Sequence, residues 1–265
     1  MTSLSIVIVT YNARASVAAC LRSLSDTPPA IPHDITIVDN ASTDGVMPMV
    51  AADWAAVNIV DMGRNAGFAV ATNAGIRASA GTYVLLLNSD TMVRAGAIDT
   101  LVATLEAAPD VAIAGPRIVD GGGEPELSFG RMISPVAEIR QKVLGRRAEW
   151  IARETRREQF VDWVSGACLL VRRADAEAVG LLDERFFLYT EDVDFCAAVR
   201  ARGRRVLFTP RAEIVHLRGQ SRATAPHAAS LAYRRSHLAF YEKHHPTWAP
   251  WLRLYLRLKG ELPSD

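Results

Sequence analysis

The sequence has little cysteine and almost no net charge. Its three cysteines, Cys20, Cys168 and Cys196, lie far apart in apolar segments. An odd, scattered set fits neither a disulfide framework nor a metal cage, so we expect reduced core residues. The formal net charge is +1 and 49% of the residues are hydrophobic, which is typical of a globular protein and argues against disorder and nucleic-acid binding.

Long apolar runs and phosphate-binding glycine motifs are also missing. No stretch of about 18 uncharged apolar residues occurs, so no membrane-spanning helix is expected. The first apolar run, 4–9, has neither a basic leader nor a cleavage site, which indicates a first strand. The reduced cysteines favour a cytoplasmic location. The motifs G-x-x-x-x-G-K-[ST] and, at the first helix, G-x-G-x-x-G are absent, which argues against kinases, P-loop ATPases and dinucleotide-binding enzymes.

Short apolar runs alternate with segments of helical periodicity in the first half of the chain. The pattern predicts helices around 17–24, 67–80 and 95–108 and strands at 4–10, 34–39, 57–62, 82–87 and 111–114. Such alternation is typical of an α/β fold, with a mainly parallel central sheet and helices on both faces.

The pattern becomes irregular after Pro116. We expect a turn at 120–123, a charged helical excursion at 131–160, an apolar run at 161–172 and a short helix ending near Gly180. A helix from the acidic cluster at 189–194 to Arg202 follows, then strands at 204–209, ending at Pro210, and 213–217. We predict a catalytic domain at 1–226, with a nucleotide-binding half at 1–115 and an acceptor-binding half at 116–226.

The tail, 227–265, is aromatic and basic, and we expect amphipathic helices there. Two interpretations remain open. Such helices suit the headgroup region of an anionic membrane. Alternatively, the tail packs its aromatic side chains on the domain.

Polar residues follow each of four predicted strands. Thr10, Tyr11 and Asn12 follow the first strand, and Asn88, Ser89 and Asp90 follow a strand with three consecutive leucines. The other two strands are followed by 39–42 and 64–67. Ligands bind at the carboxyl ends of strands in open α/β sheets, so four such ends predict a nucleotide pocket. Each end alone could instead cap a helix, and Ser42 with Asp44 is expected to do so in part.

Without a glycine-rich loop to bind its phosphates, a nucleoside diphosphate needs a divalent cation. One carboxylate with open positions suits Mg²⁺ or Mn²⁺, which take oxygen ligands and substrate phosphates. Asp90 is therefore the expected metal anchor.

Together with the second acidic cluster, these segments resemble family 2 glycosyltransferases of the GT-A fold, especially bacterial rhamnosyltransferase-like members. The resemblance covers residues 4 to about 245. The matching segments are 6–12, 38–44, 65–69 with Asn73 and Gly75, 86–90, Gly166-Ala167, 186–194 and Val215-His216.

The resemblance implies a donor site in which Asp39 recognises the nucleobase, and a metal site made by Asp90 and His216. A purely structural histidine is the alternative for His216. Asn88 stands where the family usually has a second acid, so Asp90 would carry more of the metal binding. The full set expected at the donor nucleotide is Thr10, Tyr11, Asn12, Asp39, Asn40, Asn65, Gly67, Asn73, Asn88 and Ser89.

The resemblance also implies that Asp192 is the general base for the acceptor hydroxyl, with Glu191 beside it in the catalytic pair. We expect the acceptor at Gly166, Ala167, Glu191 and Asp194. The alternative is that the acids stabilise a helix N-terminus through its dipole; both roles can hold at once, and Asp194 is the member expected to be structural. Arg218 and Arg222 are expected at the donor phosphates, unless they belong to a plain surface loop.

The resulting hypothesis is a metal-dependent, inverting glycosyltransferase of cell-wall or polysaccharide synthesis. The best single donor is dTDP-rhamnose, ahead of UDP- or GDP-sugars, and the acceptor is a saccharide or lipid-linked saccharide. Contact with the inner face of the cytoplasmic membrane and a homodimer are further expectations; nucleic acid is not an expected partner. Two alternatives are a catalytically inactive nucleotide-sugar-binding or assembly subunit and, less favoured, a sugar nucleotidyltransferase.

Overall fold

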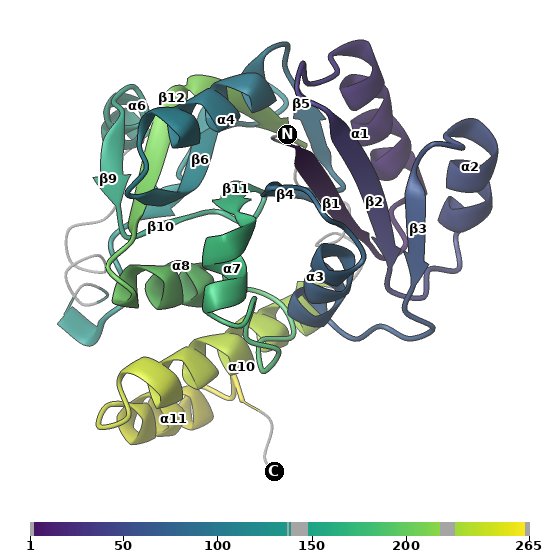
Figure 1. Ribbon diagram of the computed structural model, residues 1–265. Coiled ribbons are helices and arrows are strands. Elements are labelled where there is room, and N and C mark those ends of the chain that lie inside the picture. The colour runs from purple at the N-terminus through teal and green to yellow at the C-terminus, as the bar shows by residue number, and fades with distance from the viewer. Residues whose placement is uncertain (1–2, 137, 139–147, 218–225, 263–265) are drawn as a thin grey trace.

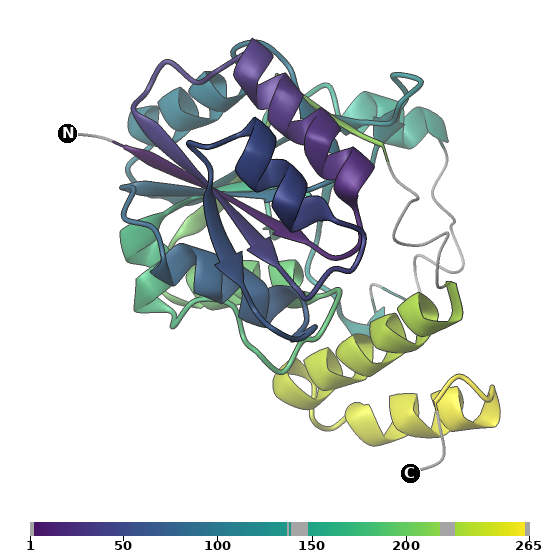
Figure 2. The same ribbon diagram turned by 90° about the vertical axis from the view of Figure 1, so that its right-hand side faces the viewer.

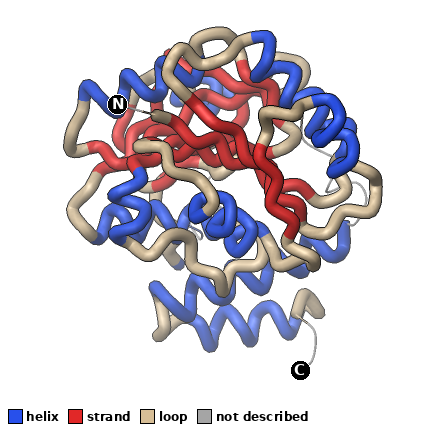
Figure 3. The backbone as a smooth tube through the Cα atoms, turned by 45° about the vertical axis from the view of Figure 1, so that its right-hand side comes forward, coloured by secondary structure: helices blue, strands red, loops and turns tan. Residues whose placement is uncertain are grey.

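The computed structural model describes residues 3–136, 138, 148–217 and 226–262 (Figure 1). Within them, a ten-stranded sheet has the order β3-β2-β1-β4-β11-β6-β12-β5, with β7 paired to β6 and β9 paired to β12. Helices cover both faces of this sheet, and a pair of C-terminal helices lies along one side (Figure 3). The predicted α/β architecture with helices on both faces is confirmed.

The first half of the sheet is parallel. It contains β1 (Leu4–Thr10), β2 (His33–Asp39), β3 (Asn58–Asp61) and β4 (Tyr83–Asn88), connected by helices α1 (Arg14–Asp26), α2 (Val46–Asp53) and α3 (Phe68–Arg77). Alternate side chains of β1 point to opposite faces, since Leu4, Ile6 and Ile8 belong to one core cluster and Val7 and Val9 to the other. Burial on both faces explains why these strands are nearly continuous apolar runs.

The second half makes the sheet mixed. Strand β11 (Cys168–Arg172) runs antiparallel between β4 and β6 (Val111–Val119), and β5 (Thr91–Val93) runs antiparallel to β12 (Arg205–His216). Strand β12 is parallel to β6. Helix α4 (Ala97–Ala107) covers the same face as α1, while α7 (Arg173–Ala178) and α8 (Glu191–Ala201) cover the face of α3.

Two strand predictions were wrong at prolines. Strand β6 continues through Pro116, and β12 continues through Pro210 as one strand where the sequence predicted two. In β12 the register shifts between Thr209 and Glu213. This irregularity tolerates a proline because no regular ladder hydrogen bond is required there.

Short elements follow β6 up to residue 164, and only α6 and most of β9 fall within the helical excursion predicted at 131–160. They are β7 (Pro125–Glu126), β8 (Phe129–Gly130), α6 (Ala148–Glu154), β9 (Gln159–Val161) and β10 (Trp163–Val164). Residues 137 and 139–147, which belong to the predicted excursion, lie outside the described residues. Helix α2 and strand β5 were not predicted.

The predicted C-terminal helices are α10 (Pro226–His244) and α11 (Ala249–Leu258), which lie side by side (Figure 2). Phe240 and Tyr241 of α10 are buried in a cluster with Phe186 and Val193. Helix α10 therefore packs on the segment that leads into α8. No helix in the described part of the chain is long and apolar enough to cross a membrane.

Candidate active site

Two buried polar side chains end the first parallel strands. Asp39, at the end of β2, is 2% exposed and accepts hydrogen bonds from the Ser42 amide at 3.0 and 3.3 Å. Thr10, at the end of the adjacent β1, is buried, and its hydroxyl oxygen has no hydrogen-bond partner among the described residues. The buried hydroxyls of Thr36 and Thr72 are likewise without a partner among the described residues, so position at the strand end, and not the unpaired oxygen alone, distinguishes Thr10.

Asparagines connect the loops that follow these strands. The Asn12 side chain accepts a hydrogen bond from the Thr43 amide at 2.7 Å, and Asn40 accepts one from Ala66 and donates one to the Gly67 carbonyl, both at 3.3 Å. Asn65 accepts a bond from the Gly67 amide. These predicted donor-site residues thus form one connected rim, along which the exposed Tyr11 lies.

Asp44 binds the starts of two helices, although their N-cap residues are Ala13 and Gly45 and neither of these makes a side-chain cap. Its carboxylate accepts hydrogen bonds from the amides of Arg14 at 2.7 Å and Val46 at 3.2 Å, the first residues of α1 and α2. Ser42 contributes differently, because its hydroxyl accepts a hydrogen bond from the Asn12 amide at 2.8 Å.

Asp90 and His216 are brought together by strand pairing. The antiparallel register of β5 and β12 places Thr91 opposite His216, and Nε2 of His216 lies 3.1 Å from Oδ1 of Asp90. On the other side of the ring, Nδ1 lies 3.6 Å from a carboxylate oxygen of Glu126. All three side chains are largely buried, so the imidazole lies between two carboxylates.

This donor set fits a divalent cation shared with a nucleotide. Within the described residues, no group of three or more His, Cys, Asp or Glu side chains could hold a metal ion by itself. Mg²⁺ and Mn²⁺ at nucleotide sites need only one or two protein carboxylates, because phosphates and water complete the coordination. Asp90 supplies one carboxylate and His216 a ring nitrogen beside it, whereas Asn88 adds no charge.

A short backbone bridge connects the Asn88 end of β4 to Asp192. The Asn88 amide donates a hydrogen bond to the Ala167 carbonyl at 3.0 Å. The neighbouring Gly166 amide donates one to Oδ2 of Asp192 at 2.8 Å. A Cβ on residue 166 would lie 3.2 Å from Cβ of Asp192, so glycine permits this close approach. The two predicted halves of the site therefore meet at residues 166–167.

Adjacent carboxyl groups begin helix α8. Glu191 is 6% exposed, and its Oε2 has no hydrogen-bond partner among the described residues. Burial, and then the negative charge of Asp192, raise the pKa of Glu191 well above its usual range. Burial also raises the pKa of Asp192, against the lowering effect of its hydrogen bonds from Gly166 and Val193.

The segment before α8 is strained and closely packed. Tyr189 and Thr190 have φ values of 70° and 72°, in the left-handed region. Gly67, with φ of 89°, contacts the same segment, because a Cβ there would lie 2.6 Å from the Phe187 carbonyl oxygen. The Phe68 amide donates a hydrogen bond to that oxygen. The donor-side loop thus positions the start of α8.

Two predicted ligand-binding side chains are fully engaged with other protein groups. Asn73 is buried; its amide nitrogen donates to the Leu182 carbonyl at 2.9 Å and to Glu184 at 3.0 Å, and its oxygen accepts from the Leu182 amide. Asp194 is buried and lies 2.8 Å from Lys243 Nζ and 2.7 Å from His244 Nε2. Positions 192 and 194 are about 200° apart on a helix, so Asp194 faces α10 and not Gly166.

Three further residues were predicted at the site. Ser89 lies on the partly exposed turn after β4. Arg218 and Arg222 lie outside the described residues.

Sequence reasoning missed Glu126 and the pair Lys243 and His244. Glu126 belongs to a two-residue strand after a glycine-rich turn, where no periodicity marks it. Lys243 also bonds to Asp183 at 2.8 Å, so it joins the segment before α8 to Asp194 in the first turn of α8. The sequence feature that could have indicated Lys243 and His244 was a basic helix following an acidic cluster.

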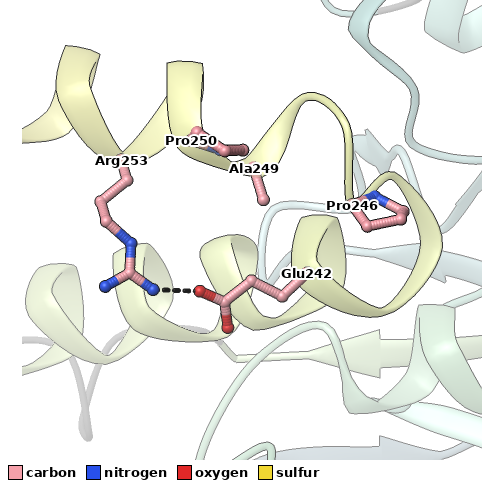
Figure 4. A pocket seen from close by; sticks show the side chains of 5 residues that line it. All are labelled: Glu242, Pro246, Ala249, Pro250 and Arg253. Carbon is pink, nitrogen blue, oxygen red and sulfur yellow. Dashed lines mark hydrogen bonds and ion pairs between the residues drawn. The ribbon is translucent and has the colours of Figure 1, made fainter.

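A small pocket between α10 and α11 lies outside this site (Figure 4). It is lined by Glu242, Pro246, Ala249, Pro250 and Arg253, and Glu242 pairs with Arg253 across it. It contains none of the predicted site residues.

Comparison with known proteins agrees with this geometry. Residues 5–178 match the model of glycosyl transferase family 2. An N-acetylglucosaminyl-diphospho-decaprenol L-rhamnosyltransferase of Mycobacterium tuberculosis is 32% identical over 98% of this chain and 92% of its own length. A dTDP-rhamnosyl transferase, RfbF, of Shigella flexneri is 26% identical over 70% of this chain and 60% of its own length.

Solved structures show the same fold at low identity. A Pyrobaculum calidifontis mannosyltransferase in complex with GDP-Man and Mn²⁺ has a TM-score of 0.62 and 19% identity over 94% of this chain and 68% of its own. GalNAc-T7 with UDP, GalNAc and Mn²⁺ has a TM-score of 0.63 and 16% identity over 82% of this chain and 44% of its own. The GT-A fold expected from the sequence is confirmed, and the chain belongs to glycosyl transferase family 2, among its rhamnosyltransferase-like members.

Proposed function

We propose that this glycosyltransferase transfers rhamnose from dTDP-rhamnose to a hydroxyl of a lipid-linked saccharide, with inversion at the anomeric carbon. The observation that carries the proposal is the 166–167 bridge, which joins the end of β4, two residues before Asp90, to the carboxylate of Asp192. An inverting transferase needs such an arrangement, with a base on the acceptor side and charge stabilisation on the donor side.

In the proposed reaction, Asp192 takes the proton of the acceptor hydroxyl. The hydroxyl oxygen forms a bond to the anomeric carbon while the bond from that carbon to the donor phosphate oxygen breaks, and its electron pair leaves with the nucleoside diphosphate. Each oxygen of Asp192 accepts one backbone hydrogen bond, from Gly166 or Val193, which fixes the carboxylate plane. Each oxygen keeps a further lone pair for the acceptor.

Asp90 and His216 would hold a divalent cation, which would supply positive charge for the departing diphosphate. Glu126 would fix the orientation of the His216 ring, since an outer carboxylate commonly orients a metal-binding histidine. Thr10 and Asp39 are proposed to contact the nucleoside. Asn73 and Asp194 become positioning residues, because their polar atoms are used within the protein.

The donor and acceptor are inferred from relatives. Both rhamnosyltransferases named above support rhamnose, the one from Shigella flexneri supports the dTDP donor, and the one from Mycobacterium tuberculosis supports a polyprenyl-diphosphate acceptor. An acceptor of that kind would place the enzyme at the inner face of the cytoplasmic membrane, with its C-terminal helices toward the lipid.

A thermal-shift panel of dTDP-, UDP- and GDP-sugars, each with and without Mn²⁺, tests the donor assignment. A ligand that binds only the native state raises the melting temperature with the logarithm of its concentration over its Kd. We expect the largest Mn²⁺-dependent rise with dTDP-rhamnose. An equal rise with UDP- or GDP-sugars, or none with any donor, would overturn the assignment.

Asn88 in place of an acid favours a second candidate, a nucleotide-sugar-binding subunit without activity. Such a protein would show the same thermal shifts but release no dTDP from dTDP-rhamnose in the presence of a lipid-linked acceptor.

A further inference from the structure

Large apolar side chains gather on the outward face of helix α11. Trp248, Trp251, Leu254, Tyr255 and Leu258 are between 41% and 80% exposed. From Trp251 they follow the spacing i, i+3, i+4 and i+7, so they form one stripe along the helix. We call these five residues the α11 stripe.

The rest of α11 accounts for its attachment to the protein. Ala249 and Leu256 are buried on the inner side, and Arg253 pairs with Glu242 of α10. Helix α11 is the outer member of the C-terminal pair, and α10 separates it from the sheet (Figures 1 and 2). Each side chain of the α11 stripe therefore keeps between 41% and 80% of its surface exposed, although the stripe contains two tryptophans.

The charges around the α11 stripe are basic. Helix α11 contains Arg253 and Arg257 and no acidic residue, and Lys259 follows directly. In helical projection Arg257 flanks the stripe on one side and Lys259 on the other. The Lys259 ammonium lies 5.2 Å from the centre of the Tyr255 ring, at the edge of the stripe.

We propose that the α11 stripe lies in the headgroup region of an anionic bilayer. A ten-residue helix is about 15 Å long, about half the thickness of a bilayer core, so it would lie in the membrane plane. Tryptophan and leucine on one face with flanking cations are typical of interfacial helices. A second copy of the chain is the weaker candidate, because a stable interface takes roughly 20–30 residues per side.

The contacts of α10 connect this surface to the catalytic centre. Lys243 and His244 bind the buried Asp194, two residues after Asp192, so these two partly buried side chains join the C-terminal pair to the start of α8. Docking of the α11 stripe would therefore hold the acceptor side of the site at a fixed position near the lipid. This step rests on the proposed lipid-linked acceptor.

Vesicle co-sedimentation of the full chain tests the proposal without any activity measurement. The probes are phosphatidylcholine vesicles and vesicles that also contain phosphatidylglycerol. We expect the wild type to bind the anionic vesicles more strongly. In the double variant Trp251→Glu, Leu258→Glu the affinity for vesicles should fall by about tenfold or more, because two large apolar side chains no longer leave water. Phe160→Glu, at an exposed apolar position of β9, is the matched control and should bind as the wild type.

Charge is tested separately by Arg257→Glu, Lys259→Glu, which should abolish the preference for anionic vesicles. Unchanged melting temperatures and unchanged transfer to a short-chain, water-soluble acceptor would show that the variants are folded and competent.

Equal binding by the wild type and the Trp251→Glu, Leu258→Glu variant, or no binding by the wild type, would overturn the proposal. A wild-type dimer in light scattering that this variant dissociates, without vesicle binding, would assign the stripe to a second copy. Loss of all transfer by the wild type with vesicle binding intact would count against the proposed reaction and not against the docking surface.

Discussion

At the scale of single residues, the neighbours Glu191 and Asp192 differ in their surroundings. Asp192 keeps part of its surface exposed and accepts backbone hydrogen bonds on both oxygens, whereas Glu191 is buried with one oxygen unpaired among the described residues. Two carboxyl groups in such contact rarely ionise together. Glu191 is therefore the member that keeps its proton longer, and Asp192 is the one suited to act as a base.

Glu191→Gln should change how stability depends on pH. The raised pKa of Glu191 means that the folded protein holds a proton that the unfolded chain releases near the ordinary value of 4.5. The free energy of unfolding of the wild type therefore contains a term that falls as pH rises above that value, and the variant lacks this term. Urea unfolding across pH should show a variant that gains stability relative to the wild type as pH increases. Exposed Glu124→Gln is the control, and identical pH profiles for all three proteins would contradict the assignment.

Asp90→Ala should remove the metal dependence of donor binding. Calorimetry with dTDP should give nearly the same Kd with and without Mn²⁺, since the carboxylate proposed to hold the metal is lost. If Mn²⁺ still strengthened dTDP binding to the variant as it does to the wild type, Asp90 would not be the metal anchor.

Glu126→Gln should weaken Mn²⁺ binding less than Asp90→Ala does. Loss of an outer-shell partner of a metal-binding histidine costs about 10- to 100-fold in metal affinity, and we expect the lower end because Glu126 lies 3.6 Å from the ring. Mn²⁺ titration followed by electron paramagnetic resonance measures this directly. Glu124→Gln, in the same hairpin, should leave the affinity unchanged; equal effects of the two substitutions would show that Glu126 has no special role.

At the scale of elements, the loop before α3 and the segment before α8 are held together through Gly67. An alanine there would need a conformation that only glycine adopts readily and would place Cβ 2.6 Å from the Phe187 oxygen. Gly63 also has a positive φ, but a Cβ there would have no atom within 4 Å.

Gly67→Ala should therefore destabilise the fold by about 3 kcal/mol or more, and Gly63→Ala by about 1 kcal/mol. Denaturant unfolding of both variants measures the difference. Equal losses would mean that the contact with Phe187 relaxes freely and does not position α8.

The long, regular elements could be predicted from the sequence because their apolar periodicity is local. Strands β1, β2 and β4 and helices α3 and α8 lie close to their predicted positions. Strand β5 has three residues and β7 has two, too few for any periodicity, yet they bring Asp90 and Glu126 to His216. Pairing between distant segments determines such elements, and the sequence does not record it locally.

At the scale of the whole molecule, the site is formed where the two halves of the sheet meet. The parallel half supplies the strand ends from Thr10 to Asp90, and the antiparallel β11 follows the bridge that joins them to Asp192. The motif order predicted which residues would gather. It did not predict that Asp194 faces away from the bridge, because its partners, Lys243 and His244, lie 49 and 50 residues further along the chain.

The most direct test of the central claim is transfer of sugar from dTDP-rhamnose to a lipid-linked acceptor by the wild type and by Asp192→Asn, with Mn²⁺ present. The wild type should release dTDP and form a product whose anomeric configuration is opposite to that of the donor. The variant should lose about 10²- to 10⁴-fold in turnover while binding dTDP with unchanged affinity, because only proton acceptance is removed. Normal turnover in the variant, or weakened donor binding with turnover intact, would contradict the account.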